Sequence, residues 1–93
     1  MQKTILITGS TDGIGLETVK ILAGQGHRLL LHGRNQEKLA NTQAMLREVD
    51  GSGEVETYRA DLSKLTEVAE LAEALAASHK HLDVLINNCL LYT

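Results

Sequence analysis

Cysteine is almost absent from this chain of 93 residues, in which Cys89 stands alone. A single cysteine excludes an intrachain disulfide and a cysteine-based metal cluster, and it suits a reducing compartment. No basic partner can be assigned to Cys89, so we expect a small buried apolar residue rather than a nucleophile.

Long apolar stretches and an excess of basic residues are also missing. No stretch approaches the roughly 20 apolar residues that cross a bilayer. The chain opens with a short strand-like run instead of the apolar core of a signal peptide. The net charge of −3 argues against nucleic acid and anionic membrane surfaces as partners. We therefore expect a cytoplasmic protein.

The apolar residues are arranged in short segments of two alternating kinds. Runs of aliphatic residues predict strands at residues 3–8, 27–32, 55–60 and 82–87. Apolar residues that recur every three or four positions predict helices at residues 13–25, 36–49 and 64–78. The right-handed crossover rule turns this βαβαβαβ order into an α/β fold, a doubly wound parallel sheet in a single domain.

Each predicted helix carries an apolar face and signals at its ends. Gly26 is placed to cap the first helix, while Asn35 and Ser63 are N-cap candidates for the second and third. The predicted inward residues are Ile14, Thr18, Ile21 and Leu22 in the first helix and Leu39, Met45 and Leu46 in the second. In the third they are Leu65, Val68, Leu71, Ala72, Leu75 and Ala76.

Three glycines follow the first predicted strand and open the first helix. Gly9 permits a sharp exit from the strand, Gly13 lets the backbone approach a pyrophosphate, and Gly15 lets the helix pack close to the strand. The helix N-terminus adds unpaired N–H groups and a partial positive charge. A glycine-rich turn without a ligand is the alternative. No Gly-Lys-Ser/Thr ending follows, which disfavours a nucleoside triphosphate loop.

Three motifs in this order resemble those of the short-chain dehydrogenase/reductase family. Residues 8–15 (TGSTDGIG) resemble its TGxxxGxG cofactor motif, Asp61-Leu62 its adenine-contacting pair, and Asn87-Asn88 the first half of its NNAG motif. The resemblance implies the N-terminal part of a Rossmann domain over residues 1–93, with sheet order 3-2-1-4 and a dinucleotide as ligand. The cofactor-binding residues it implies are Gly9, Ser10, Thr11, Gly13, Ile14, Gly15, Arg34, Asp61, Leu62 and Asn88.

The choice of cofactor depends on the end of the second strand. An acidic residue there would bind the ribose 2′-hydroxyl of NAD, and an arginine would pair with the 2′-phosphate of NADP. This chain has Gly33 followed by Arg34, which favours NADP over NAD. A solvated arginine at a helix entry is the alternative for Arg34. Asp12 argues against NADP, since NADP-preferring members of the family often carry a basic residue in that part of the turn.

The later motifs admit structural alternatives. Asp61 would accept a hydrogen bond from the adenine amino group, or cap the loop before Ser63. The resemblance places Asn88 beside the cofactor ribose, whereas Asn87 is expected to fix backbone between the central strands. Cys89-Leu90 stands where the family has Ala-Gly, and leucine cannot offer the bare backbone of glycine near the nicotinamide ribose.

The sequence offers no candidate residues for a metal site or for proton transfer. Of the four histidines, His27, His32, His79 and His81, the last two are spaced by two around a helix end, not by the four of a helical ligand pair. The family's acid/base pair is a tyrosine with a lysine four residues on. Leu62 lies four residues beyond Tyr58, and Thr93 alone follows Tyr92. We therefore expect no metal site, no catalytic residue and no turnover from this chain.

The sequence supports two alternative hypotheses for the function. In the first, the chain is the NADP-binding N-terminal part of a short-chain oxidoreductase, a class of enzyme that transfers hydride between NADP(H) and a carbonyl or alcohol. In the second, it is a non-catalytic dinucleotide-binding or regulatory module. The sheet is expected to stop at the fourth strand. Its unpaired edge would then be a surface for self-association.

Overall fold

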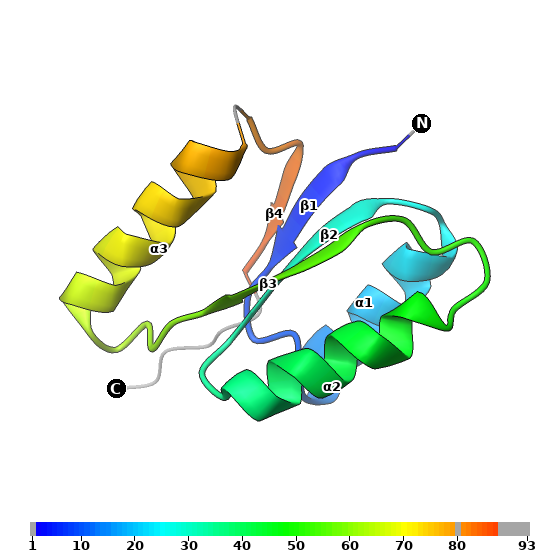
Figure 1. The fold of residues 1–93 in the computed structure, drawn as a ribbon, viewed down its shortest axis with the longest axis horizontal. Helices are drawn as coiled ribbons and strands as arrows, with labels where there is room; N and C mark the ends of the chain where they lie inside the picture. The colour runs from blue at the N-terminus through cyan, green and yellow to red at the C-terminus, as the bar shows by residue number, and fades with distance from the viewer. Residues whose placement is uncertain (1, 80, 88–93) are drawn as a thin grey trace.

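The computed structural model describes residues 2–79 and 81–87 (Figure 1). Strands and helices alternate along the chain: β1 (Thr4–Ile7), α1 (Gly13–Gly24), β2 (Arg28–Gly33), α2 (Gln36–Arg47), β3 (Val55–Arg59), α3 (Leu65–Ser78) and β4 (Val84–Ile86). The strands form one parallel sheet in the order β3-β2-β1-β4. The predicted α/β fold and strand order are confirmed.

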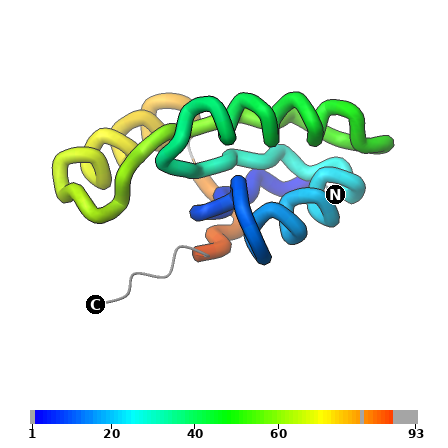
Figure 2. The backbone as a smooth tube through the Cα atoms, turned by 90° about the horizontal axis from the view of Figure 1, so that it is seen from below, coloured from blue at the N-terminus to red at the C-terminus, as the bar shows by residue number. Residues whose placement is uncertain are grey.

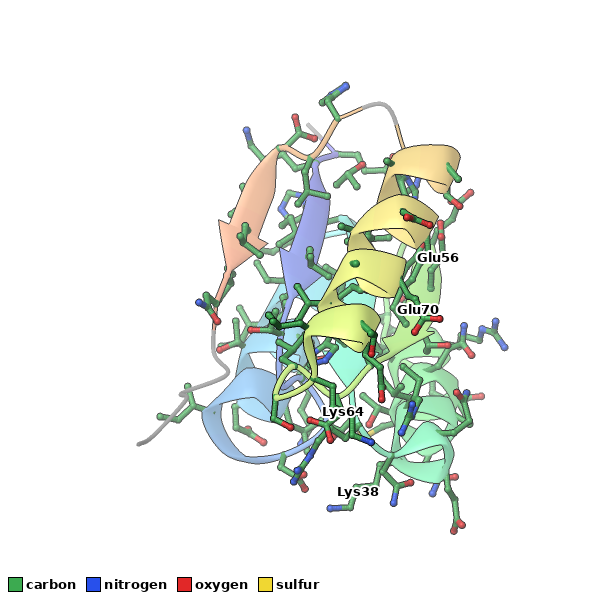
Figure 3. All side chains as sticks on the ribbon, turned by 90° about the vertical axis from the view of Figure 1, so that its left-hand side faces the viewer. Lys38, Glu56, Lys64 and Glu70 are labelled. Atoms are coloured by element: carbon green, nitrogen blue, oxygen red, sulfur yellow. The ribbon has the colours of Figure 1, made fainter. Side chains whose placement is uncertain are left out.

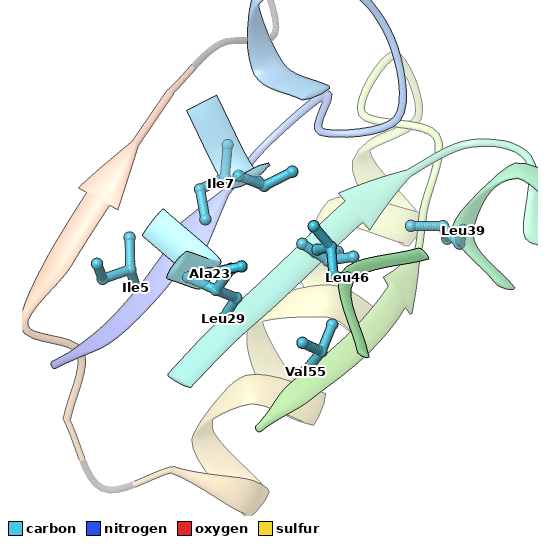
Figure 4. Packing of buried hydrophobic residues seen from close by; sticks show 9 residues of the cluster. Ile5, Ile7, Ala23, Leu29, Leu39, Leu46 and Val55 are labelled. Carbon is cyan, nitrogen blue, oxygen red and sulfur yellow. The ribbon is translucent and has the colours of Figure 1, made fainter. Parts of the chain in front are cut away.

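The two central strands are the most apolar part of the sheet. Ile5, Leu6 and Ile7 in β1 pair with Leu29, Leu30 and Leu31 in β2, and all six are buried. Such unbroken aliphatic runs are typical of parallel strands covered on both faces. Figures 1 and 3 show α1 and α2 together on one face and α3 on the other. The core between the sheet and the first two helices contains Leu39, Leu46 and Val55 (Figure 4).

The predicted inward face of α1 is wrong in part. Gly15, Val19 and Ala23 are the buried residues, whereas Ile14 is 77% and Ile21 64% exposed. Small residues at intervals of four let the helix approach the sheet closely, so this stripe packs in place of the bulkier one. Leu16 and Leu22 flank the packed stripe. Gly26, with φ of 80°, follows the helix end as predicted.

The second helix follows the prediction more closely. The Asn35 side chain accepts a hydrogen bond from the Lys38 N–H at 3.0 Å, which confirms it as the N-cap. Leu39 and Leu46 are buried as expected, but Met45 is partly exposed and Thr42 takes the buried position. The Thr42 hydroxyl can be buried because it donates to the Lys38 carbonyl at 2.8 Å.

The third helix has a different N-cap residue from the one predicted, and its apolar residues are more exposed than predicted. Its N-cap position is Lys64, not Ser63, because the Ser63 backbone and hydroxyl bind the Asp61 carboxylate. No residue of α3 is buried, and Leu65 is 87% exposed. The edge strand β4 likewise exposes Leu85. No helix among the described residues is long and apolar enough to cross a membrane.

Candidate functional site

The carboxyl ends of all four strands meet at one edge of the sheet. Parallel strands place the segments that follow them side by side, and this is where ligands bind in open α/β sheets. The segments at this edge are residues 8–15 after β1, Gly33 and Arg34 around the end of β2, residues 60–62 after β3, and Asn87 after β4. The structure therefore brings together the described residues that the sequence predicts for the site.

The turn between β1 and α1 needs glycine at two positions. Gly9 has φ of 60° and Gly13 φ of 56°, in the left-handed region that side chains rarely adopt. Apart from its chain neighbours and the backbone of its own helix, an added Cβ at Gly13 would have no atom of the described residues within 4 Å. Asp12, at the N-cap position of α1, makes no side-chain cap. The turn thus presents bare backbone and a helix N-terminus to open space.

Ser10 and Thr11 face the protein with their side chains. The fully buried Ser10 hydroxyl donates to the His32 carbonyl and accepts from the His32 N–H, each at 3.1 Å. The Thr11 methyl lies beside Gly33. The Ser10 backbone N–H also donates to the His32 carbonyl, at 3.0 Å, so both the N–H and the hydroxyl of Ser10 are bound within the protein. Ile14 at the start of α1 is, by contrast, 77% exposed.

His32 also lies at this edge of the sheet, and no role for it was predicted from the sequence. Its ring is 1% exposed, with Nδ1 accepting from the Gly9 N–H at 3.1 Å and Nε2 lying 2.9 Å from the Ala60 carbonyl. Burial lowers the pKa of His32, although the hydrogen bond to Ala60 acts in the opposite direction. A polar residue within an aliphatic strand run was the available signal in the sequence.

The end of β2 is tightly packed around Gly33. An added Cβ at Gly33 would lie 3.2 Å from the Thr11 methyl and 3.3 Å from Leu39 Cδ2, closer than ordinary packing allows. The next residue, Arg34, is exposed, and its carbonyl accepts from Arg59 Nε at 3.0 Å. The backbone at Arg34 is therefore tied to β3 while its guanidinium faces solvent.

An ion pair joins the glycine turn to α2. Lys38 Nζ lies 3.2 Å from Asp12 Oδ2 and 3.4 Å from Oδ1. Both side chains are more than half exposed, and Figure 3 shows Lys38 at the end of the molecule where the strands finish. The carboxylate that argued against NADP is thus partly neutralised by a cation from the next helix.

Asp61 has the structural role that the sequence analysis gave as its alternative. Its Oδ1 accepts from the Ser63 N–H at 3.0 Å and the Ser63 hydroxyl at 2.7 Å. These bonds, helped by the positive charge of Arg34, hold the pKa of the Asp61 carboxyl below its usual value. Its own N–H donates to Glu67 at 2.8 Å. Leu62 beside it is half-buried.

The fourth strand joins the first at the same edge. The Thr8 hydroxyl donates to Asn87 Oδ1 at 3.0 Å, and the Thr8 N–H donates to the Ile86 carbonyl at 3.0 Å. Figure 2 shows the turn after β1 beside the end of β4. Asn87 thus ties the two strands through the Thr8 side chain. Asn88, predicted beside the ribose, lies outside the described residues, as do Cys89 and Leu90.

Comparison with known proteins gives the family. A family model described as short chain dehydrogenase matches residues 3–91. The chain belongs to this family. The resemblance carried by the three sequence motifs is therefore confirmed.

Individual relatives agree with this assignment. The fatty acyl-CoA reductase of Acinetobacter baylyi is 36% identical over 86 residues, which are 92% of this chain and 28% of the reductase. A solved metagenomic short-chain oxidoreductase in complex with NADP is 31% identical, with a TM-score of 0.84 over 96% of this chain and 39% of that one. An NADH-dependent reductase complexed with NAD is 38% identical, with a TM-score of 0.76 over 92% and 35%. The chain spans less than half the length of each of these three proteins.

Proposed function

We propose that this chain is the dinucleotide-binding part of a short-chain oxidoreductase and that it binds NADP in preference to NAD. The observation that carries the proposal is the turn at residues 8–15, where Gly9 and Gly13 take left-handed conformations between a buried strand and a helix N-terminus. Backbone N–H groups and a positive helix end at such a turn favour a pyrophosphate. Solved relatives hold NADP or NAD.

The residues at the edge divide among the parts of the dinucleotide. Gly9, Ser10, Thr11, Gly13, Ile14 and Gly15 form the turn. The N–H groups of Gly9 and Ser10 are bound to His32 and fix the shape of the turn. The backbone at the helix N-terminus, from Gly13 onward, binds the pyrophosphate, and the exposed Ile14 side chain adds apolar contact. Asp61 has both of its Ser63 bonds on Oδ1, so Oδ2 is the atom to accept the adenine amino group. Leu62 contacts the adenine from the same segment, and Asn88 contacts the ribose.

The preference for NADP has three supports at the ends of β2 and α2. The exposed Arg34 offers a guanidinium to the 2′-phosphate. Thr11 and Leu39 lie close to the Cβ position of Gly33, so the acid that would hold a 2′-hydroxyl would fit there only if these side chains moved. Lys38 offsets the charge of Asp12, so a phosphate meets less repulsion from the turn.

The reaction needs more than these residues provide. When bound, the nicotinamide supplies hydride transfer. No tyrosine in the 93 residues is followed four positions later by lysine, the pair that exchanges the proton in this family. We infer that the chain by itself holds the cofactor and that turnover requires residues outside it.

A glycine substitution in the turn tests the site. Gly13→Val places branched carbons in the open space where the pyrophosphate would lie, so we expect NADP⁺ affinity to fall at least tenfold in isothermal titration calorimetry. Gly51→Val is the control for backbone strain, since Gly51 also has a left-handed φ, of 82°, in the loop before β3. A Cβ at Gly51 would lie 3.2 Å from the Gly24 carbonyl oxygen, so this control is at least as disruptive to the fold as Gly13→Val. Circular dichroism checks that both variants fold. Unchanged affinity in folded Gly13→Val protein would contradict the proposed site.

A further inference from the structure

His32 contacts two parts of the candidate site that lie far apart in the sequence. Its Nδ1 accepts from the Gly9 N–H and its Nε2 contacts the Ala60 carbonyl, at 3.1 and 2.9 Å. A carbonyl oxygen only accepts, so Nε2 carries the proton and Nδ1 is the acceptor. Only the neutral ring in this tautomer satisfies both contacts.

These two contacts fix the parts of the site against each other. Gly9 is the first glycine of the turn, and Ala60 directly precedes Asp61. The His32 backbone is bound as well, through the Ser10 hydroxyl and the Ser10 N–H. One buried residue therefore connects the turn proposed for the pyrophosphate with the segment proposed for the adenine.

We propose that His32 is a positioning residue for the dinucleotide, which holds Gly9 and Ala60 in place as a neutral ring and releases the turn when Nδ1 gains a proton. This inference rests on the proposed function. Once Nδ1 takes a proton from solvent, the ring has two N–H donors and can no longer accept from Gly9. The Gly9 N–H and the new ring N–H then repel each other, and dinucleotide binding weakens.

The surroundings keep the neutral form dominant near neutral pH. Burial of the ring lowers the pKa of His32, so protonation occurs below the usual range near 6.5. Binding is therefore at full strength above that range and is lost as the pH falls through the lowered value. Linkage requires the reverse effect too: bound dinucleotide must lower the pKa of His32 further.

Other charged groups near His32 come from β3, α3 and the flanking loops. Tyr58 stands opposite His32 in the register, and its hydroxyl donates to Glu56 at 3.0 Å. Burial and Glu56 raise the pKa of Tyr58, and a phenol is in any case neutral in acid, so Tyr58 does not titrate over this range. Glu56 also contacts His79 Nε2 at 3.1 Å. Beside Ala60, the Asp61 N–H donates to Glu67 of α3, which pairs with Arg59. Arg34 follows β2, and the Asp12–Lys38 pair lies at the glycine turn.

Two substitutions distinguish the contribution of Nδ1 from that of Nε2. His32→Asn places an amide oxygen near the Nδ1 position, whereas His32→Gln places an amide N–H near the Nε2 position but removes the Nδ1 acceptor that His32 offers to the Gly9 N–H. At pH 8 we expect NADP⁺ affinity to fall about fivefold in His32→Gln, which loses the acceptor for Gly9, and to fall less in His32→Asn, which loses only the contact to Ala60. His79→Asn is the control for the other histidine of this face.

The pH profile distinguishes positioning from a purely structural role. Between pH 8 and pH 5, wild type and His79→Asn should lose at least threefold more NADP⁺ affinity than His32→Asn, measured by titration calorimetry. The 2′-phosphate itself titrates near pH 6, at about the same value in every variant, and cancels in this comparison. Equal profiles in wild type and His32→Asn, or wild-type affinity that rises on acidification, would overturn the inference.

A measurement on wild type covers the case of unfolded variants. Histidine ¹⁵N chemical shifts report the tautomer and pKa of His32, and we expect the Nε2–H tautomer and a further lowered pKa when NADP⁺ saturates the protein. The Nδ1–H tautomer, or a pKa unmoved by bound NADP⁺, would overturn the inference alone. Wild type that binds no NADP⁺ would overturn the proposed function and this inference with it.

Discussion

Cofactor choice in this chain is a matter of single residues at the ends of β1 and β2. Thr11 and Leu39 lie 3.2 and 3.3 Å from where a Gly33 side chain would begin. Lys38 binds Asp12 across the same edge. Arg34 and Lys38 place positive charge at this edge and Asp12 is paired with Lys38, which favours an added phosphate.

The ion pair at Lys38 gives a prediction of its own. Lys38→Met leaves Asp12 unpaired beside the site, so we expect NADP⁺ affinity to fall about two- to fivefold, with a smaller loss for NAD⁺, as suits an exposed and screened pair. The two dissociation constants come from titration calorimetry at low ionic strength. Lys20→Met, which removes a similar exposed pair with Glu17, should change neither. An equal loss for both cofactors would show that Lys38 does not act on the 2′-phosphate.

Secondary structure elements could be predicted from the sequence wherever a segment carried a single local pattern with no competing one. The aliphatic runs in β1 and β2, the Asn35 cap and the Gly26 end all follow from local rules. The inward face of α1 did not, because Ile14 and Ile21 compete with a stripe of smaller residues and only the sheet decides between them. His32 was missed because its partner Ala60 lies 28 positions away, a contact that no local pattern reveals.

The corrected face of α1 can be tested by stability. Val19 is fully buried against the sheet and Ile21 is 64% exposed. Val19→Ala should lower the free energy of unfolding by about 2 kcal/mol, because it leaves a cavity. Ile21→Ala should change it by no more than about 0.5 kcal/mol. Urea unfolding followed by circular dichroism gives both values, and a larger loss for Ile21→Ala would restore the face predicted from sequence.

At the scale of the whole molecule, the face of the sheet under α1 and α2 is better covered than the face under α3. The face under α1 and α2 encloses the apolar core, whereas α3 buries no residue and the edge strand β4 exposes Leu85. The proposed site uses the ends of all four strands but depends most on β1 and β2, the buried central pair. The most deeply buried strands of the sheet therefore lie next to the proposed dinucleotide site.

Direct titration of the purified chain with NADP⁺, and separately with NAD⁺, tests this account most directly. At pH 8 and low ionic strength, calorimetry should show one site per chain and an NADP⁺ dissociation constant at least about tenfold below that for NAD⁺, since the Arg34 guanidinium gains a charged phosphate partner. Equal or tighter binding of NAD⁺ would contradict the proposed cofactor choice. Folded chain that binds neither nucleotide would contradict the account as a whole.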